Sequence, residues 1–245
     1  MNDIVLRPSY WASFSGGKDS LYMINIILEN PQLYPLDGII HFELEIDYPF
    51  IKKVCDFVEE KCKKLNIPFI RIKPDKSWEE LFCKFHYPNR IIRWCNSKYK
   101  LNAKRQMQDF LKSKGKYLVS YIGFCADEER RFKDTKYERY PLAEFGIIEK
   151  DILEWAKNVP IFNDYYKYNK RCGCMGCPVA PLSHWVYLAS FYPNEYNYFI
   201  DKILESERGG YSPFVNKSVS QLISYVERHK DLFQPNLIDY IEKNR

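Results

Sequence analysis

The chain has 245 residues, of which 46% are hydrophobic, and its formal net charge at pH 7 is +5. This length suits one sizeable α/β domain with a small appendage, and the apolar content is ample for a core. The weak positive charge is compatible with anionic substrates but is too small to demand a nucleic acid. Because the sequence shows neither a signal peptide nor an apolar run of transmembrane length, we expect a cytoplasmic protein with no membrane partner.

Apolar runs of strand length alternate along most of the chain with segments in which apolar residues recur at helical spacing. This alternation predicts an α/β fold in which a parallel sheet is sandwiched by helices, as in Rossmann-like domains. The expected strands cover residues 9–14, 36–44, 67–72 and 116–124, and the expected helices cover residues 20–30, 51–65, 98–114 and 149–159.

The pattern changes after Cys177, where two Tyr-rich segments of helical period cover residues 184–204 and 218–229. We therefore expect the chain to have two parts. The first is a sheet domain over residues 1–180. The second is a helical C-terminal extension over residues 181–245 that packs on the sheet domain.

A glycine-rich hexamer, SGGKDS, lies between the first expected strand and the first expected helix. Its two glycines let the backbone turn tightly, and the amides and dipole at a helix start favour an anion. Lys18 adds positive charge. Asp19 is suited to accept hydrogen bonds from backbone amides or to hold a metal-bound water. The spacing is not that of a Walker loop, and a plain capped helix start is the alternative. The candidate phosphate-binding residues are Ser15, Gly16, Gly17, Lys18, Asp19 and Ser20.

This hexamer resembles the PP-loop of the adenine-nucleotide α-hydrolase-like superfamily, whose members bind adenine-nucleotide phosphates there and often adenylate a substrate. Further segments resemble the phosphoadenylyl-sulfate (PAPS) reductase-like branch of that superfamily, and they follow the family order across residues 10–180. The resemblance implies an ATP or PAPS-like ligand. The residues that it carries over to the nucleotide site are Asp47, Arg93, Lys100, Gly123, Asp127, Glu128 and Arg131.

Three cysteines, Cys172, Cys174 and Cys177, lie within six residues together with two glycines. Such spacing lets the thiols converge on one metal centre, whereas burial as small apolar side chains is the alternative. The resemblance implies Cys95 as the fourth ligand. The iron–sulfur members of the branch have a Cys-Cys pair upstream, but this chain has Trp94 before Cys95. Both a 4Fe–4S cluster and zinc therefore stay open, and we favour the cluster slightly.

The leading hypothesis is a PAPS reductase-family enzyme that uses ATP and Mg²⁺ for adenylation linked to sulfur transfer, with Lys18, Asp19 and Arg131 as catalytic residues. Sulfonucleotide reductases attack with a cysteine on a C-terminal segment, but no cysteine follows Cys177 here. One alternative is therefore a PAPS or adenylyl-sulfate reductase in which Cys125 or a cluster cysteine attacks. Another is a non-catalytic nucleotide- or metal-binding component of a nucleic-acid modification complex. A nucleic acid or a sulfur donor is the expected partner besides the nucleotide.

Overall fold

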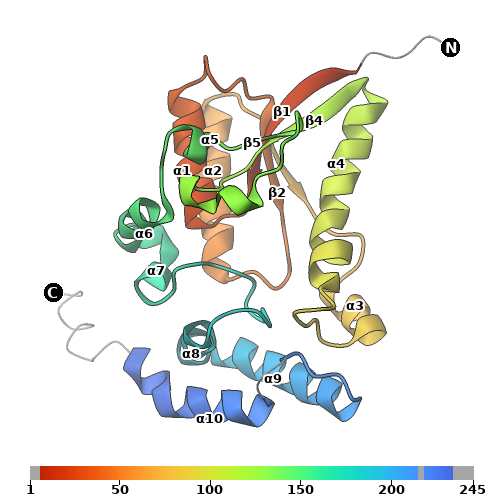
Figure 1. Cartoon of the computed structure of the whole chain (residues 1–245), viewed down its shortest axis with the longest axis vertical. Coiled ribbons are helices and arrows are strands. Elements are labelled where there is room, and N and C mark those ends of the chain that lie inside the picture. Colours follow the sequence, from red (N-terminus) through yellow and green to blue (C-terminus); the bar gives the residue numbers. More distant parts are fainter. Residues whose placement is uncertain (1–5, 215–217, 234–245) are drawn as a thin grey trace. The chain divides into compact units, whose positions relative to one another are not determined.

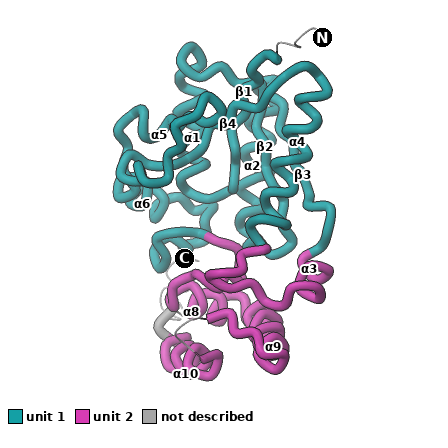
Figure 2. The backbone as a smooth tube through the Cα atoms, turned by 45° about the vertical axis from the view of Figure 1, so that its right-hand side comes forward, with its two compact units in different colours: residues 1–77, 95–172 teal, residues 78–94, 173–245 magenta. Residues whose placement is uncertain are grey.

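The structure is a computed structural model that describes residues 6–214 and 218–233. Its residues form two compact units, coloured separately in Figure 2. Unit 1 consists of residues 1–77 and 95–172, and unit 2 consists of residues 78–94 and 173–245. The sequence predicted a single boundary after residue 180. The structure instead groups residues 78–94 and 173–180 with the C-terminal helices, because these segments pack on those helices.

Unit 1 is built on a five-stranded sheet with the strand order β3-β2-β1-β4-β5. Every neighbouring pair of strands is parallel, which confirms the predicted α/β class. In the central register, Trp11 lies opposite Gly38 on one side and opposite Ser120 on the other. The strands are β1 (Arg7–Phe14), β2 (Gly38–Phe42), β3 (Phe69–Ile72), β4 (Lys116–Tyr121) and β5 (Glu138–Arg139).

Helices cover both faces of this sheet, with α4 on one face and α1 and α2 on the other (Figure 1). The α4 face is closed by a buried apolar cluster of Trp11, Ile40, Met107, Leu111 and Leu118. The unit 1 helices are α1 (Lys18–Glu29), α2 (Pro49–Lys64), α4 (Leu101–Ser113), α5 (Pro141–Glu144), α6 (Glu149–Lys157) and α7 (Tyr165–Tyr168). Shorter turns are the π-helix Cys95–Lys100 and the 3₁₀ helices Ala126–Arg131 and Pro160–Phe162.

The expected strands and helices of unit 1 are present, with different ends. The expected strand 116–124 stops at Tyr121, and residues 122–125 form a loop that leads into the 3₁₀ helix. The expected helix 98–114 is preceded by a π-helical turn that begins at Cys95. Strand β5 has only two residues, which explains why its sequence carries no strand signal of its own.

Unit 2 is helical, with the segment 78–94 packed against α9. The Tyr87 amide donates to the Ser206 hydroxyl at 2.7 Å, and the Tyr87 hydroxyl donates to the Gly176 carbonyl at 2.7 Å. The expected helix 184–204 is broken before Pro193, which lacks an amide proton for the helical ladder. The helices are α3 (Trp78–Phe85), α8 (Leu182–Phe191), α9 (Pro193–Arg208), α10 (Val219–His229) and the 3₁₀ helix Lys230–Phe233.

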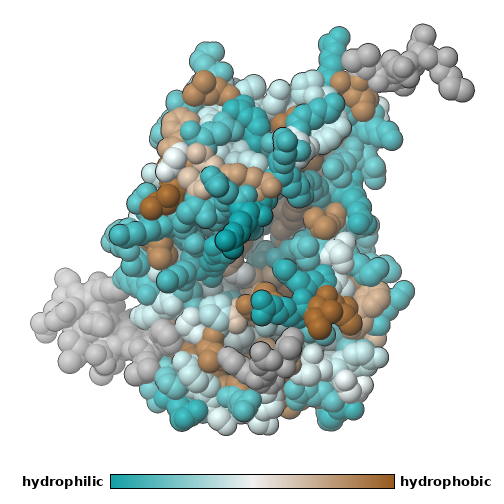
Figure 3. Space-filling view, in the orientation of Figure 1, coloured by the Kyte–Doolittle hydropathy of each residue, from teal (hydrophilic) through white to brown (hydrophobic). Residues whose placement is uncertain are grey.

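The surface seen in Figure 3 is mainly hydrophilic, with apolar side chains scattered over it. The large exposed apolar residues come from separate segments, and Ile91 is the most exposed of them, at 82%. Within residues 6–214 and 218–233, no helix has the length and apolar character needed to cross a bilayer.

Candidate functional site

The strand order of the sheet reverses between β1 and β4. The chain proceeds from β1 outward to β2 and β3 on one side, and to β4 and β5 on the other. In open parallel sheets, ligands bind at the carboxyl ends of the strands where the order reverses in this way. Residues 15–17 follow β1 directly, and residues 122–127 follow β4. Two of the segments that the sequence singled out therefore meet at the switch point.

The glycine loop has the backbone geometry that the sequence predicted. Gly16 has φ of +75°, a conformation that glycine adopts without strain. A Cβ at Gly16 would also come within 2.7 Å of the Ile51 side chain on α2. Gly17 is the N-cap of α1, a helix of twelve residues, so the helix begins directly after this loop. The first amides of a helix have no acceptor within the helix itself. Both the turn and the close packing therefore require glycine at position 16.

The two loop serines hold the loop in shape. The Ser20 hydroxyl donates to the Gly17 carbonyl at 2.9 Å and accepts from the Ser15 amide at 3.2 Å. The Ser15 and Ser20 hydroxyl oxygens are 3.1 Å apart, and the Gly17 amide donates to the Ser15 hydroxyl at 3.4 Å. These bonds fix the loop before any ligand is bound, which lowers the entropy cost of binding.

Lys18 is buried and lies between two carboxylates. Its side chain is 1% exposed, and Nζ lies 2.6 Å from Asp19 Oδ1 and 3.7 Å from Glu149 Oε1. Burial raises the pKa of Asp19 above its usual value, and the Lys18 charge opposes that rise. The buried ammonium and its carboxylates thus form a charged group directly at the start of α1.

Tyr166, on α7, contacts the loop from a distance of 148 residues along the chain. Its hydroxyl oxygen accepts the Lys18 amide at 2.9 Å, and the side chain is buried. The hydroxyl proton of Tyr166 has no acceptor among the residues that the structure describes. Burial raises the pKa of Tyr166 well above its usual value, so the hydroxyl stays protonated. Tyr166 was not predicted as a site residue, because nothing in the tyrosine-rich sequence around it indicates which ring reaches the loop.

The loop after β4 lies directly against the start of α1. A Cβ at Gly123 would come within 3.1 Å of the Asp19 backbone, which accounts for glycine there. Cys125 Sγ lies 3.8 Å from Asp19 Oδ1. Burial raises the pKa of Cys125 to about 12, so at neutral pH this residue is a thiol rather than a nucleophilic thiolate. Its surroundings therefore disfavour the role of relocated nucleophile.

A charged cavity of about 490 Å³ follows this loop. Arg131 donates to Glu128 at 2.6 Å, and its guanidinium lies 3.8 Å from the centre of the Phe124 ring. The predicted residues Asp127, Glu128 and Arg131 are thus brought together. The lining residues are Ala126, Asp127, Glu128, Glu129, Arg130, Arg131 and Arg171.

Glu149 connects this cavity to the glycine loop. Its carboxylate faces Lys18 and accepts Arg171 Nε at 2.9 Å, and its amide donates to Asp127 at 3.1 Å. Arg171 also donates to Glu128 at 3.0 Å. The Arg171 hydrogen bond is the main reason that the pKa of Glu149 is lowered. The sequence analysis did not predict either Glu149 or Arg171 as a site residue.

Asp47 and Lys100 lie within electrostatic reach of each other in unit 1. Burial raises the pKa of Asp47 to about 6, and the charge of Lys100 opposes the rise. Lys100 ends the π-helical turn that begins at Cys95. Such turns are frequent at functional sites, because they displace side chains from the regular helical positions.

The predicted metal ligands are divided between the two units. Cys95 and Cys172 belong to unit 1, whereas Cys174 and Cys177 belong to unit 2, together with Arg93. The Cys177 amide donates to the Cys174 carbonyl at 3.2 Å, so these two thiols flank a tight turn. No group of three or more His, Cys, Asp or Glu side chains is arranged to hold a metal ion within the described part of the chain. The metal centre therefore stays a prediction.

Comparison with known sequences finds a relative without an assigned activity. It is an uncharacterized protein of Methanocaldococcus jannaschii, 30% identical over 215 residues, which are 81% of this chain and 48% of the relative. The chain therefore spans about half the length of this curated relative. No protein-family model matches the chain.

Comparison with solved structures finds similar chains at low scores. FMN adenylyltransferase from Candida glabrata matches with a TM-score of 0.40 and 15% identity, covering 68% of this chain and 53% of that chain. The U34-tRNA thiolase NcsA from Methanococcus maripaludis, solved with its 4Fe–4S cluster, matches with a TM-score of 0.39 and 15% identity. This second match covers 93% of this chain and 83% of the thiolase. Likeness at this level carries no argument about function.

Proposed function

We propose that this chain is an adenine-nucleotide-binding enzyme that uses ATP and Mg²⁺ to adenylate an acceptor, in a reaction linked to sulfur transfer. The observation that carries the proposal is the glycine loop at the start of α1, with Gly16 at positive φ, placed at the switch point of a parallel sheet. This arrangement offers backbone amides and a helix dipole to a phosphate.

The loop would hold the phosphates with main-chain and side-chain donors. The start of α1 supplies the positive end of the helix dipole, and Lys18 supplies the positive charge. Tyr166 supplies a buried hydroxyl proton that lacks an acceptor among the described residues. A buried donor without an acceptor destabilises a protein, and a phosphate oxygen would relieve that cost.

Asp19 and Glu149 fit a Mg²⁺ that accompanies the nucleotide, because carboxylate oxygens are the ligands that this ion prefers. Both carboxylates lie against Lys18 in the structure. Carboxylates engaged with Mg²⁺ would leave the ammonium of Lys18 available to phosphate oxygens. Mg²⁺ bound there would neutralise negative charge on the phosphates.

Cleavage between the α and β phosphates needs stabilisation of the departing pyrophosphate. In the proposed mechanism the helix dipole at the start of α1 and the charge of Lys18 stabilise this charge, and the Ser15 and Ser20 bonds keep the loop in shape. Arg131 and Arg171, in the adjoining cavity, are each bonded to a carboxylate. In the proposed mechanism they would exchange this partner for oxygens of the acceptor or of the α-phosphate, which guanidinium groups bind in a bidentate manner.

Two experiments test the proposal. Titration calorimetry of the full chain with Mg-ATP should show binding, and Lys18→Ala should weaken it at least about tenfold because a charge-assisted contact is lost. Lys112→Ala, an exposed residue of α4, is the matched control and should bind like the wild type. Analysis of the turnover products by phosphorus NMR should give AMP and pyrophosphate. Formation of ADP and phosphate, or equal binding by Lys18→Ala, would contradict the proposal.

The reductase alternative with Cys125 as the nucleophile is less well supported, because this thiol is buried and protonated, whereas attack by a cluster cysteine stays a prediction. The non-catalytic alternative predicts nucleotide binding without any product, so the same product analysis separates it from the enzyme. A nucleic-acid component predicts binding that weakens steeply with salt.

A further inference from the structure

We propose that unit 2 carries a second ligand site, a pocket for a small organic anion with a flat apolar body. The pocket is a cavity of about 540 Å³, and every residue that lines it belongs to unit 2. Its volume falls in the range of roughly 300 to 1,000 Å³ that is typical of small-molecule sites. The lining residues are Arg90, Arg93, Pro178, Val179, Ala180, Leu182, Trp185, Pro213, Phe214 and Leu222.

The charge of the lining is entirely positive. Arg90 and Arg93 are its charged residues, and it contains no Asp or Glu. Both arginine side chains are exposed, and among the described residues Arg90 forms neither an ion pair nor a hydrogen bond through its guanidinium. A guanidinium that is not already bound to a carboxylate is available for a carboxylate, sulfonate or phosphate group of a ligand, which it binds through two parallel N–H donors.

Arg90 lies in a turn that is held by hydrogen bonds, and Arg93 follows this turn. The side-chain oxygen of Asn89 accepts the amides of Ile91 and Ile92 at 2.8 and 2.6 Å, and the Asn89 amide donates to the Ile92 carbonyl at 3.2 Å. The Trp94 indole after this turn donates to the His86 carbonyl at 2.9 Å. Because the backbone on both sides of Arg90 is fixed, little main-chain entropy is lost when a ligand binds.

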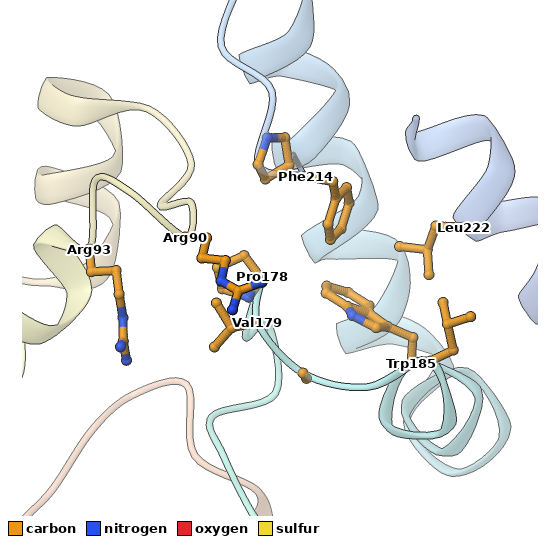
Figure 4. Close-up of a pocket in the computed structure, with 10 residues that line it drawn as sticks. Arg90, Arg93, Pro178, Val179, Trp185, Phe214 and Leu222 are labelled. Atoms are coloured by element: carbon orange, nitrogen blue, oxygen red, sulfur yellow. The ribbon is translucent and has the colours of Figure 1, made fainter. Parts of the chain in front are cut away.

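The opposite wall is apolar and aromatic. Figure 4 shows the arginines on one side of the pocket and Trp185, Phe214 and Leu222 on the other. The rings of Trp185 and Phe214 are 6.2 Å apart and nearly perpendicular, at 77°. Trp185 and Leu222 are almost fully buried, at 1% and 2% exposed, so the apolar surface open to a ligand comes mainly from the Phe214 ring and the exposed Val179. This surface suits an apolar ligand body, and the Arg90 guanidinium opposite suits its anionic end.

The two walls together define the ligand class. An inorganic anion would leave the accessible apolar lining at Phe214 and Val179 uncovered, and a neutral apolar molecule would not use the Arg90 guanidinium. A cation would be repelled. An aromatic carboxylate, sulfonate or phosphate satisfies both walls at once.

The test uses a pair of probes that differ in charge but little in size. 2-Naphthoate carries the anionic group, and 2-naphthalenemethanol is its neutral counterpart. In calorimetric titration of the full chain, naphthoate should bind at least about fivefold more tightly than the alcohol, because it gains a charge-assisted contact. The titration is repeated at saturating ATP, and the naphthoate affinity should be unchanged.

Variants assign the binding to this pocket. Arg90→Gln should weaken the binding of naphthoate by about fivefold or more, and its affinity for the alcohol should stay within about twofold of the wild-type value. Arg208→Gln removes an exposed arginine of unit 2 outside the pocket and should have no effect. Val179→Asp should weaken naphthoate through charge repulsion. Val179→Asn introduces a neutral side chain of the same size as Asp and should not weaken naphthoate binding. Because Val179 is 44% exposed, both variants should fold.

The proposal is overturned if naphthoate fails to bind the folded chain at millimolar concentration, or if it binds no better than the alcohol. It is also overturned if Arg90→Gln and Val179→Asp both bind naphthoate like the wild type. Loss of naphthoate binding in the presence of ATP would place the probe at the glycine loop instead. None of these outcomes depends on adenylation activity, so the proposed function and this pocket can fail separately.

Discussion

At the residue scale, Lys18 shows how the glycine loop is prepared for a ligand. Its ammonium lies against Asp19 and Glu149, and its amide is bound by Tyr166. A buried lysine without such partners would destabilise the fold, because transfer of an unpaired charge from water is costly. The carboxylates of Asp19 and Glu149 therefore offset the cost of burying the Lys18 ammonium.

Tyr166→Phe tests the role of the buried hydroxyl. The variant keeps the ring, whose centre lies 4.8 Å from that of Phe162, so the fold should be retained. Loss of the hydroxyl removes the proposed hydrogen bond to phosphate. The affinity for Mg-ATP, measured by calorimetry, should therefore fall about fivefold. Tyr117→Phe, which removes a hydroxyl elsewhere in unit 1, is the control. Unchanged or tighter ATP binding by Tyr166→Phe would show that the hydroxyl does not contact the ligand.

Asp47→Asn tests the raised pKa of about 6. Because the folded-state pKa lies above the unfolded value, the folded state binds the proton more tightly, and stability contributed by this group falls as the pH rises from about 4 to about 6. Asn removes the buried charge. The variant should therefore be more stable than the wild type at pH 7.5, by about 1 to 3 kcal/mol, and nearly equal to it at pH 4.

Urea unfolding at the two pH values measures this difference. If Asp47 also serves the nucleotide, the same variant should bind Mg-ATP more weakly at pH 7.5 while unfolding at higher urea. A variant that is destabilised at pH 7.5 would show that the carboxylate is a stabilising group and that its burial is not the dominant effect.

At the element scale, the two faces of the unit 1 sheet differ in what packs on them. The face covered by α4 is closed by apolar packing of Met107 and Leu111 against β1, β2 and β4. The glycine loop belongs to α1, which lies on the other face (Figure 1). Substitutions in the α4 core should therefore change stability without changing the ligand site.

Met107→Ala is the test at this scale. It should lower the free energy of unfolding by about 2 to 4 kcal/mol, because a buried side chain is replaced by a cavity. Phe110→Ala, on the same helix but 52% exposed, should cost much less. The ATP affinity of folded Met107→Ala should match the wild type, and a large loss of affinity would show that the α4 face is coupled to the loop.

At the scale of the whole molecule, the predicted cysteine ligands come from both units. Cys95 and Cys172 belong to unit 1, and Cys174 and Cys177 belong to unit 2. If the chain binds a metal through these cysteines, loss of the metal should lower the free energy of unfolding, because a ligand that binds only the folded state stabilises it.

Elemental analysis after anaerobic purification tests the metal centre. About four iron and four sulfide per chain would indicate a 4Fe–4S cluster, and one zinc would indicate a structural tetrathiolate site. Cys174→Ser should lose the metal, whereas Cys83→Ser, which changes an exposed cysteine outside the predicted set, should retain it. Wild-type chain without iron or zinc would refute the predicted centre.

Local sequence patterns were sufficient for the elements and for the loop. Period and glycine placement predicted four of the strands, the parallel class and the turn at Gly16, because strand formation, helix starts and positive φ depend on residues that are close in the chain. The side chains that complete the site come from farther away. Tyr166 reaches Lys18 across 148 positions, and Arg171 reaches Glu149 across 22.

Only the tertiary structure decided these pairings, together with the division of the chain into units and the pocket beside Arg90. Residues 78–94 join the C-terminal helices because Tyr87 bonds Ser206 and Gly176, contacts that no period in the sequence encodes. Burial is likewise a property of the folded chain, and it is burial that raises the pKa of Asp47 and Cys125. The sequence by itself thus determined which backbone could form, and packing decided which side chains meet.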